Sequence, residues 1–191
     1  MPKVSSRTHF EGALHSSLEE PPLSFALVDL DDFKRLNDEE GTQKGDAVLG
    51  IVTDRLSHDL PSGSSVTHLG GDAWAVALPG TTPEDALLLL EPIRRSLAPL
   101  RLSIGIVGFP DHTDDPTQLG VLADEALARA KRDRGNKTAI YVEEKMILKS
   151  NYYPRGQLER LSALAERLGR TEASILREAL VEYLEKRRSA V

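Results

Sequence analysis

The stretch SFALVDLDD (residues 24–32) joins a continuous apolar run to three carboxylates. An unbroken apolar run is typical of a strand that is buried on both faces of a sheet, because neither face of such a strand meets water. Ligands of layered sheet proteins bind at the carboxyl ends of such strands, where Asp29, Asp31 and Asp32 lie. Carboxylates beside phosphates suit Mg²⁺, which prefers oxygen ligands. The alternative interpretation is that Asp31, Asp32 and Asp38 are only capping and turn residues.

Strand-like and helix-like segments alternate outward from this stretch, up to about residue 143. Such alternation predicts a domain in which helices cover a sheet. Thr82 and Pro83 mark a helix start, and the Gly70-Gly71-Asp72 turn between two apolar runs predicts a hairpin. The pattern predicts helices over 45–60, 83–98 and 116–133, and strands over 66–69, 74–78, 102–107 and 138–142.

The composition indicates a folded protein, since 40% of the 191 residues are hydrophobic and 28% are charged. No apolar run reaches the roughly 18 residues that a membrane span needs. The first residues lack the apolar region of a secretory signal. The absence of cysteine excludes disulfides, thiolate metal sites and a cysteine nucleophile. A cytoplasmic location is therefore expected.

Charge divides the chain into an acidic body and a basic tail. Residues 1–144 carry 14 Lys and Arg against 24 Asp and Glu, whereas residues 145–191 carry 10 against 6. A basic segment of this kind can engage phosphates. We expect two domains, residues 1–143 and 144–191. In the tail, the pattern predicts a strand over 146–153 and helices over 154–168 and 171–187, a set too small to bury a core alone.

Four blocks of sequence, in this order, carry a resemblance to a known family: DLDDFKRLNDEEGTQKGDAVL (29–49), LGGDAW (69–74), LSIGIV (102–107) and ADEALARAKRDRGN (123–136). They resemble the motifs of GGDEF, or diguanylate cyclase, domains over roughly residues 5–143. The resemblance implies an α+β fold with a central, mostly antiparallel sheet flanked by helices. It also implies a guanine nucleotide, GTP or cyclic di-GMP, bound together with Mg²⁺.

The resemblance further implies a role for each matching position. Asn37 and Asp46 match the residues that read the guanine, and their amide and carboxylate groups suit the donors and acceptors of its edge. Lys131 matches a lysine that neutralises the triphosphate. The implied nucleotide-binding residues are Phe33, Lys34, Asn37, Asp46, Gly70, Gly71 and Lys131, and the implied metal ligands are Asp29, the backbone carbonyl of Leu30, and Asp72.

The signature block departs from the family at its fourth position, where Ala73 replaces a glutamate. Phosphoryl transfer depends on positioning and on charge stabilisation by metal ions, so we expect this loss to impair metal placement more than guanine recognition. Arg134-Gly135 inverts the Gly-Arg order of the family, and Thr42 replaces its usual histidine. We therefore expect a degenerate cyclase without catalytic residues of its own, which binds cyclic di-GMP in preference to GTP because the family is associated with that signal.

The tail sequence KSNYYPRGQLERLSALAERLGRTEASILREALVEYLEK (149–186) resembles the ribbon-helix-helix DNA-binding family. The resemblance implies a swapped homodimer, in which two copies of the strand pair as an antiparallel ribbon that enters the major groove. Alternation places three residues of the strand on one face, and a slip of one residue would exchange that face for the other. The predicted DNA contacts are Lys149, Asn151, Tyr153, Arg155, Arg170 and Thr171.

The leading hypothesis is a dimeric transcription regulator that senses a guanine nucleotide through its first domain and binds operator DNA through its tail. The main alternative is an active diguanylate cyclase that the tail dimerises or localises. A third hypothesis makes the first domain a structural scaffold, and a fourth makes the tail a dimerisation module alone.

Overall fold

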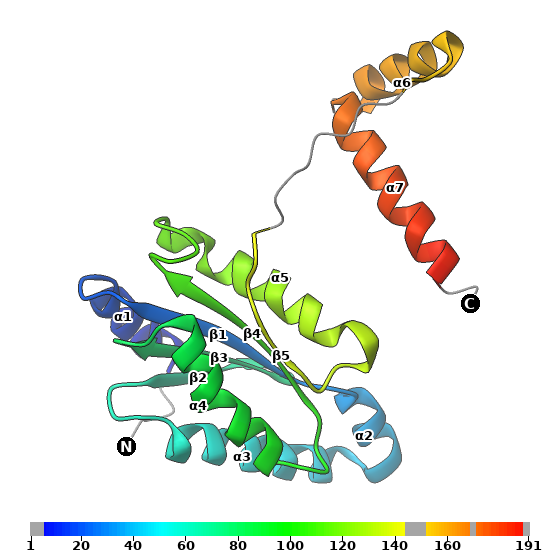
Figure 1. Ribbon diagram of the computed structural model, residues 1–191. Helices are drawn as coiled ribbons and strands as arrows, with labels where there is room; N and C mark the ends of the chain where they lie inside the picture. The colour runs from blue at the N-terminus through cyan, green and yellow to red at the C-terminus, as the bar shows by residue number, and fades with distance from the viewer. Residues whose placement is uncertain (1–5, 144–151, 169–170, 189–191) are drawn as a thin grey trace. The chain divides into compact units, whose positions relative to one another are not determined.

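The computed structural model describes residues 6–143, 152–168 and 171–188. The chain divides into two compact units, residues 1–144 and 145–191. The first unit is a five-stranded sheet with helices on both faces (Figure 1). Within the described ranges, no helix combines the length and apolar character that a membrane span requires.

Strand β1 (Leu23–Leu30) lies at the centre of the sheet, whose strand order is β2-β3-β1-β4-β5. The apolar run is almost entirely buried on both faces of the sheet, as predicted, and it has a neighbouring strand on each side. It pairs antiparallel with β3 and β4, while the short β5 runs parallel to β4. This mixed sheet confirms the α+β fold. The other strands are β2 (Ser65–Gly70), β3 (Ala73–Pro79), β4 (Leu102–Phe109) and β5 (Thr138–Ile140).

Helices cover both faces of the sheet (Figure 1). Side chains alternate along β1, so Phe25 packs in one core with Phe10 and Ala123, whereas Val28 packs in the other with residues of α3 and α4. The first core belongs to α1 (Arg7–Leu18) and α5 (Leu119–Lys131). The second belongs to α3 (Thr42–Asp59) and α4 (Pro83–Ser96).

Three helical segments differ from the helices that the pattern predicted, and the first is α1, which was not among them. Residues 33–40 form α2 (Phe33–Glu40), which the pattern did not predict, because in so short a segment only Phe33 and Leu36 mark an apolar side. The single helix predicted over 116–133 is instead α5 with a 3₁₀ turn at each end.

Trp74 anchors the β2–β3 hairpin to α3. Its side chain is fully buried, and its indole N–H donates a hydrogen bond to Thr53 Oγ1 at 2.9 Å. The ring of His68 packs against it, with 5.1 Å between the ring centroids. His68 Nε2 also lies 2.9 Å from the carbonyl oxygen of Gly71. These contacts hold the turn in which Asp72 lies.

Gly105 allows α5 to pack directly onto β4. A Cβ atom at this position would overlap the carbonyl oxygen of Ala123 and the amide nitrogen of Leu127, and it would lie 2.7 Å from Leu127 Cα. All three are backbone atoms, so no side-chain rotation relieves the overlap. The glycine of the LSIGIV block therefore sets how closely α5 approaches the sheet.

The second unit contains two helices, α6 (Arg155–Leu168) and α7 (Glu172–Arg188), close to the two predicted ranges. Of the predicted strand over 146–153, residues 146–151 lie outside the described residues, and Tyr152 and Tyr153 belong to no helix or strand. Among the described side chains of this unit, Ala165 is the only buried hydrophobic one. The described side chains therefore give these two helices no core of their own. Large apolar side chains stay exposed at Leu158, Leu168, Leu176, Leu180, Tyr183 and Leu184.

We predict that Gly105→Ala lowers the free energy of unfolding of the first unit by about 2 kcal/mol or more, because α5 must move away from β4. The matched control is Gly50→Ala in α3, where a Cβ atom meets open space and alanine is the better helix former by roughly 0.8–1 kcal/mol. Urea unfolding followed by the fluorescence of Trp74, the single tryptophan, measures both variants. Equal stability of the two variants would contradict the close packing of α5 on β4.

Candidate functional site

The carboxyl end of β1 opens into a pocket of about 620 Å³. Its walls come from the β1–α2 connection, the β2–β3 turn, the residue before β4 and the C-terminal end of α5. Four carboxylates and five cationic side chains line it, a mixture that suits a ligand with phosphate groups. The carboxylates are Asp29, Asp31, Asp32 and Asp72, and the cations are Lys34, Arg35, Arg101, Lys131 and Arg134.

Asp29 and Lys131 form a direct ion pair across the pocket. Lys131 Nζ lies 2.6 Å from Asp29 Oδ1, and the Asp29 side chain is only 15% exposed, against 43% for Lys131. Burial raises the pKa of the Asp29 carboxyl, and the carboxylates of Asp72 and Asp31 raise it further, while Lys131 opposes the rise. The lysine therefore supplies the main compensation for a carboxylate that is largely withdrawn from water.

The β2–β3 turn places Asp72 beside this pair. Gly70 and Gly71 adopt positive φ angles of 110° and 59°, a backbone conformation that glycine tolerates without strain. The amide N–H of Leu30 donates to the carbonyl oxygen of Asp72 at 2.9 Å, which ties the turn to β1. Ala73 is the register partner of Asp29, so both side chains project from the same face of the sheet. The residue that faces Asp29 therefore offers no side-chain oxygen ligand.

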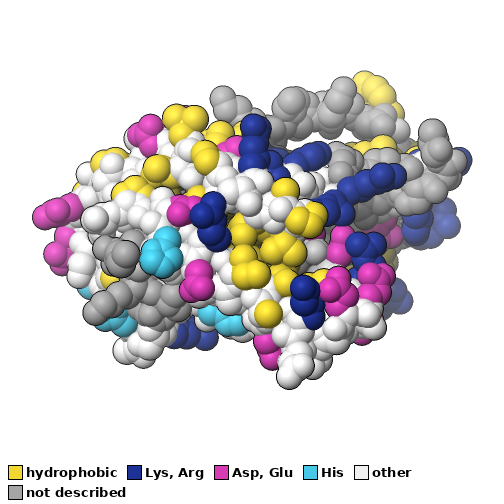
Figure 2. Space-filling view, turned by 90° about the horizontal axis from the view of Figure 1, so that it is seen from below, with side chains coloured by type: hydrophobic (Ala, Val, Ile, Leu, Met, Phe, Trp, Pro, Cys, Tyr) yellow, Lys and Arg dark blue, Asp and Glu magenta, His cyan; other side chains and the backbone are white. Residues whose placement is uncertain are grey.

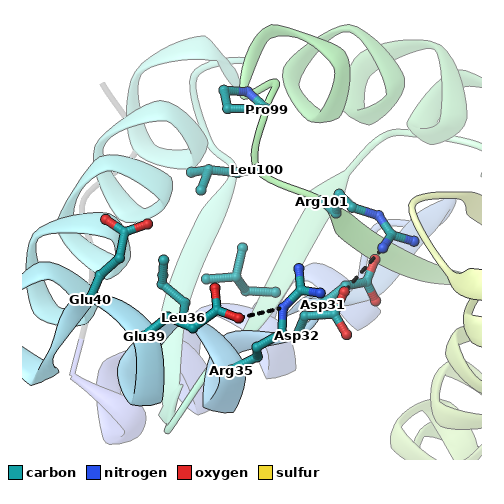
Figure 3. Close-up of a pocket in the computed structure, with 10 residues that line it drawn as sticks. Asp31, Asp32, Arg35, Leu36, Glu39, Glu40, Pro99, Leu100 and Arg101 are labelled. Carbon is teal, nitrogen blue, oxygen red and sulfur yellow. Dashed lines mark hydrogen bonds and ion pairs between the residues drawn. The ribbon is translucent and has the colours of Figure 1, made fainter.

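Asp31 and Asp32 have structural partners within the protein. This agrees in part with the interpretation of both as capping and turn residues. Asp31 accepts hydrogen bonds from Ser103 Oγ at 2.8 Å and from the amide N–H of Asn136 at 2.7 Å. Asp32, with a positive φ of 61°, pairs with Arg101 at 3.0 Å. Figure 3 shows Arg101 reaching to Asp32 over a smaller neighbouring pocket. These two carboxylates hold loops together.

The loop after α5 carries a further cation into the pocket. Arg101 donates to the carbonyl oxygen of Arg134, and Arg134, Gly135 and Asn136 all have positive φ angles. A Cβ atom on Gly135 would lie 2.7 Å from the carboxylate oxygens of Asp31, so only glycine fits there. Arg134 lines the pocket despite the inverted Gly-Arg order, which sequence reasoning had treated only as a departure.

An ion-pair cluster on α4 supports the same loop from outside. Arg94 donates to Asn136 Oδ1 at 2.5 Å and to Glu91 Oε1 at 2.7 Å. Hydrogen bonds from Arg94, together with those from Thr138 and Arg95, lower the pKa of Glu91 to about 2. The carboxylate of Glu91 therefore stays charged throughout the neutral range, and the loop keeps its outer attachment.

The predicted nucleotide and metal residues fall into two groups. Phe33, Lys34 and Lys131 line the pocket, as do the three predicted metal ligands Asp29, Leu30 and Asp72. The other predicted residues lie outside its lining: Asn37 on α2, Asp46 exposed on α3, and Gly70 and Gly71 in the adjoining turn. Arg35, Arg101 and Arg134 line the pocket and were missed, because no motif letter marked the first two.

The donor set fits one Mg²⁺ only if a ligand brings phosphate oxygens with it. Asp29 and Asp72 supply two carboxylates, and Mg²⁺ is usually held by one or two carboxylates plus substrate phosphates. In the described part of the chain, no group of three or more His, Cys, Asp or Glu is arranged to hold a metal ion. A metal centre held by protein groups alone therefore does not fit this pocket.

A second hollow, of about 470 Å³, lies between α2, α3 and the α4–β4 connection. Its walls are mostly apolar and include Ile51, Leu97 and Pro99. Figure 2 shows apolar side chains gathered on the face that carries α3, with charged side chains around them. Such walls suit an apolar contact better than a phosphate.

The predicted DNA contacts lie mostly at or beyond the edge of the described residues. Lys149, Asn151 and Arg170 are outside them. Tyr153 is 42% exposed, and the guanidinium of Arg155 forms an exposed ion pair with Glu159 at 3.1 Å. Thr171 precedes α7, and its carbonyl oxygen accepts from the amide N–H of Ile175. The ribbon-helix-helix assignment stays a prediction.

Comparison with known proteins bears on the first unit. A family model described as diguanylate cyclase, GGDEF domain, matches residues 1–137. The chain is 35% identical over 161 residues to the probable diguanylate cyclase DgcF of Escherichia coli (strain K12), covering 74% of this chain and 51% of that protein. It is also 35% identical over 163 residues to the diguanylate cyclase TpbB of Pseudomonas aeruginosa (strain UCBPP-PA14), covering 76% of this chain and 38% of that protein. The chain thus spans about a third to a half of these relatives.

Solved structures agree. The active GGEEF domain of a diguanylate cyclase from Vibrio cholerae matches with a TM-score of 0.67 at 27% identity, covering 74% of this chain and 100% of that chain. The GGDEF domain of TpbB from Pseudomonas aeruginosa gives 0.67 at 32%, with 75% and 100% covered. A microbial GGDEF domain described with bis-(3,5)-cyclic di-GMP gives 0.63 at 27%, with 70% and 92% covered. With sheet order, motif blocks and family match in agreement over the first unit, the chain belongs to the diguanylate cyclase GGDEF domain family.

Proposed function

We propose that the first unit binds a guanine nucleotide at the end of β1, with cyclic di-GMP favoured over GTP, and turns it over poorly. We further propose that the second unit dimerises the chain and binds operator DNA. The protein is then a nucleotide-responsive transcription regulator. A change in nucleotide occupancy acts on DNA binding only if the nucleotide prefers one arrangement of the two first units in the dimer.

The observation that carries the nucleotide proposal is an unpaired amide oxygen on α2, next to the first turn of α3. Asn37 Oδ1 is buried without a hydrogen-bond partner in the described structure. A buried acceptor in this state costs about 1–3 kcal/mol, which a ligand donor would recover. Gly45 leaves the space beside it, because a Cβ there would fall on Asn37 Oδ1. Asp46 follows directly and adds a carboxylate acceptor, which suits the N–H groups of a guanine edge.

The pocket at the end of β1 supplies the phosphate half of the proposed site. Lys34, Lys131 and Arg134 offer charged donors to phosphate oxygens. For turnover, Asp29, Asp72 and the carbonyl of Leu30 would hold one Mg²⁺ beside the nucleotide, and this ion would neutralise phosphate charge in the reaction.

Ala73 supports poor turnover. Its register places it opposite Asp29, where the family signature has glutamate, so one carboxylate is missing from the acidic set. Charge stabilisation by metal ions is a large part of phosphoryl-transfer catalysis, whereas base recognition uses other residues. We therefore expect the missing carboxylate to abolish most of the turnover and to leave nucleotide binding intact.

A second candidate function is diguanylate cyclase activity, and the relatives favour it, because DgcF and TpbB are both described as diguanylate cyclases. Joining two GTP molecules needs two sites that face each other, which a dimer formed by the second unit would supply. Ala73 is the feature against this function.

The tail proposal rests on charge and on exposed apolar surface. Residues 145–191 carry a net positive charge, and α7 exposes Leu176, Leu180, Tyr183 and Leu184. These four residues follow a spacing of three to four, which places them on one side of a helix. A second copy of the same helix pair is the simplest partner that would bury them.

We predict that isothermal titration of the full chain with Mg²⁺ present gives saturable binding of cyclic di-GMP at micromolar concentration, and that chromatography of the GTP mixture shows no cyclic di-GMP formed. Ala73→Glu is expected to produce measurable turnover, because it returns a carboxylate to the strand facing Asp29. Robust turnover by the unmodified protein would establish the cyclase instead. Absence of binding by either nucleotide would reduce the first unit to a scaffold.

We predict that Gly45→Ala weakens nucleotide binding by about tenfold or more, because the new methyl group displaces the side chain of Asn37. Gly50→Ala on the same helix, where a methyl group meets open space, serves as the matched control and is expected to bind as the unmodified protein does. Titration calorimetry measures both, and unchanged thermal unfolding verifies that both are folded. Equal affinity of the two variants would contradict the placement of the guanine beside Asn37.

We predict that the full chain selects a preferred sequence from a pool of short random DNA duplexes, and that its affinity falls with salt. The double variant Lys149→Ala, Asn151→Ala should lose sequence preference, because these residues are the proposed base readers. The control is Lys186→Ala, which also removes one positive charge, from an exposed lysine that pairs with Glu182. A monomer in sedimentation, or selection without enrichment, would contradict the ribbon-helix-helix proposal.

A further inference from the structure

The inference concerns the cation in the proposed nucleotide site, and it rests on that proposed function. In the structure, the nearest charge to Asp29 is the ammonium of Lys131, at 2.6 Å. A metal ion ligated by Asp29 would have to share its carboxylate with that ammonium or displace it. The strand opposite offers no second carboxylate to favour the metal, because Ala73 stands there.

Cationic side chains of the pocket can meet an anion without a metal. Five of them line it against four carboxylates, and one of the five, Arg35, pairs with Glu39 outside the lining at 3.8 Å. Asp29 is paired with Lys131, Asp32 with Arg101, and Asp31 accepts from a hydroxyl and an amide. Lys34 and Arg134 also line the pocket, and within the described residues neither side chain has a carboxylate partner. These two cations are therefore available to phosphate oxygens.

Lys131 can serve Asp29 and a phosphate together. An ammonium group carries three donors, and the contact with Asp29 uses one of them. The Lys131 side chain is 43% exposed, so its remaining donors face the open pocket. An ammonium in this position bridges a carboxylate and a phosphate, which is the electrostatic part of what Mg²⁺ does in such sites.

We infer that Lys131 takes the place of the divalent cation in this protein, and that the guanine nucleotide binds without Mg²⁺. Mg²⁺ loses its water ligands slowly and needs a near-octahedral set of oxygen ligands, whereas the ammonium of Lys131 already lies beside Asp29. Turnover still needs the metal, so the replacement of the family's glutamate by Ala73 separates binding from catalysis. The protein would then respond to nucleotide concentration independently of free Mg²⁺.

The test compares nucleotide affinity with Mg²⁺ and with EDTA, by titration calorimetry of the full chain with cyclic di-GMP and with GTP. We expect the dissociation constant of the unmodified protein to change by less than about threefold between the two conditions. Lys131→Met, which keeps an unbranched chain and removes the charge, is expected to weaken binding in EDTA by roughly tenfold or more. Arg132→Met, the neighbouring charge outside the pocket lining, is the matched control and should bind normally.

Ala73→Glu gives the converse test, because it adds the missing oxygen ligand. Its nucleotide binding is expected to depend on Mg²⁺, and Mn²⁺ titrated alone and followed by electron paramagnetic resonance should bind this variant but not the unmodified protein. Nucleotide binding by the unmodified protein only in Mg²⁺ would overturn the inference and leave the proposed nucleotide site intact. Binding in neither condition would overturn the proposed function itself.

Discussion

The register between β1 and β3 determines the chemistry of the whole site. It sets Ala73 opposite Asp29, and the hydrogen bond from the Leu30 amide to the Asp72 carbonyl brings the hairpin turn to the same edge. The register cannot slip by one residue, because the alternating side chains of β1 fill two separate cores and a slip would exchange them. Every charged group of the pocket is placed relative to this pair of strands.

The four carboxylates of the pocket have different partners and therefore different roles. Asp31 and Asp32 attach neighbouring loops through Ser103, the amide of Asn136 and Arg101, and so hold Arg134 at the pocket. Asp29 and Asp72 are left to meet a ligand, and Asp29 already holds the ammonium of Lys131. Under the proposed function, the site keeps a cationic surface for phosphates while the acidic set for a metal is reduced.

Sequence reasoning predicted the elements whose signals are local. The apolar run of β1, the Gly-Gly turn and the Thr82 cap all appear where expected, because each depends on neighbouring residues. The different roles of the four aspartates were not predictable, since Asp31 accepts hydrogen bonds from residues that lie 72 and 105 positions away in the chain. Helix α2 was missed because its support comes from packing on the core rather than from its own pattern. The predicted tail strand needs a second chain to pair with. A single sequence therefore indicates the strand but does not determine its pairing.

We propose that a guanine nucleotide lies between Asn37 on α2 and the pocket at the end of β1. Nuclear magnetic resonance of the isotope-labelled full chain, titrated with cyclic di-GMP, tests this most directly. We expect shifts concentrated at the amides of Gly45, Asp46 and Asp72 and at the side-chain amide of Asn37. Saturable shifts confined to other parts of the first unit, with these four groups unchanged, would contradict it.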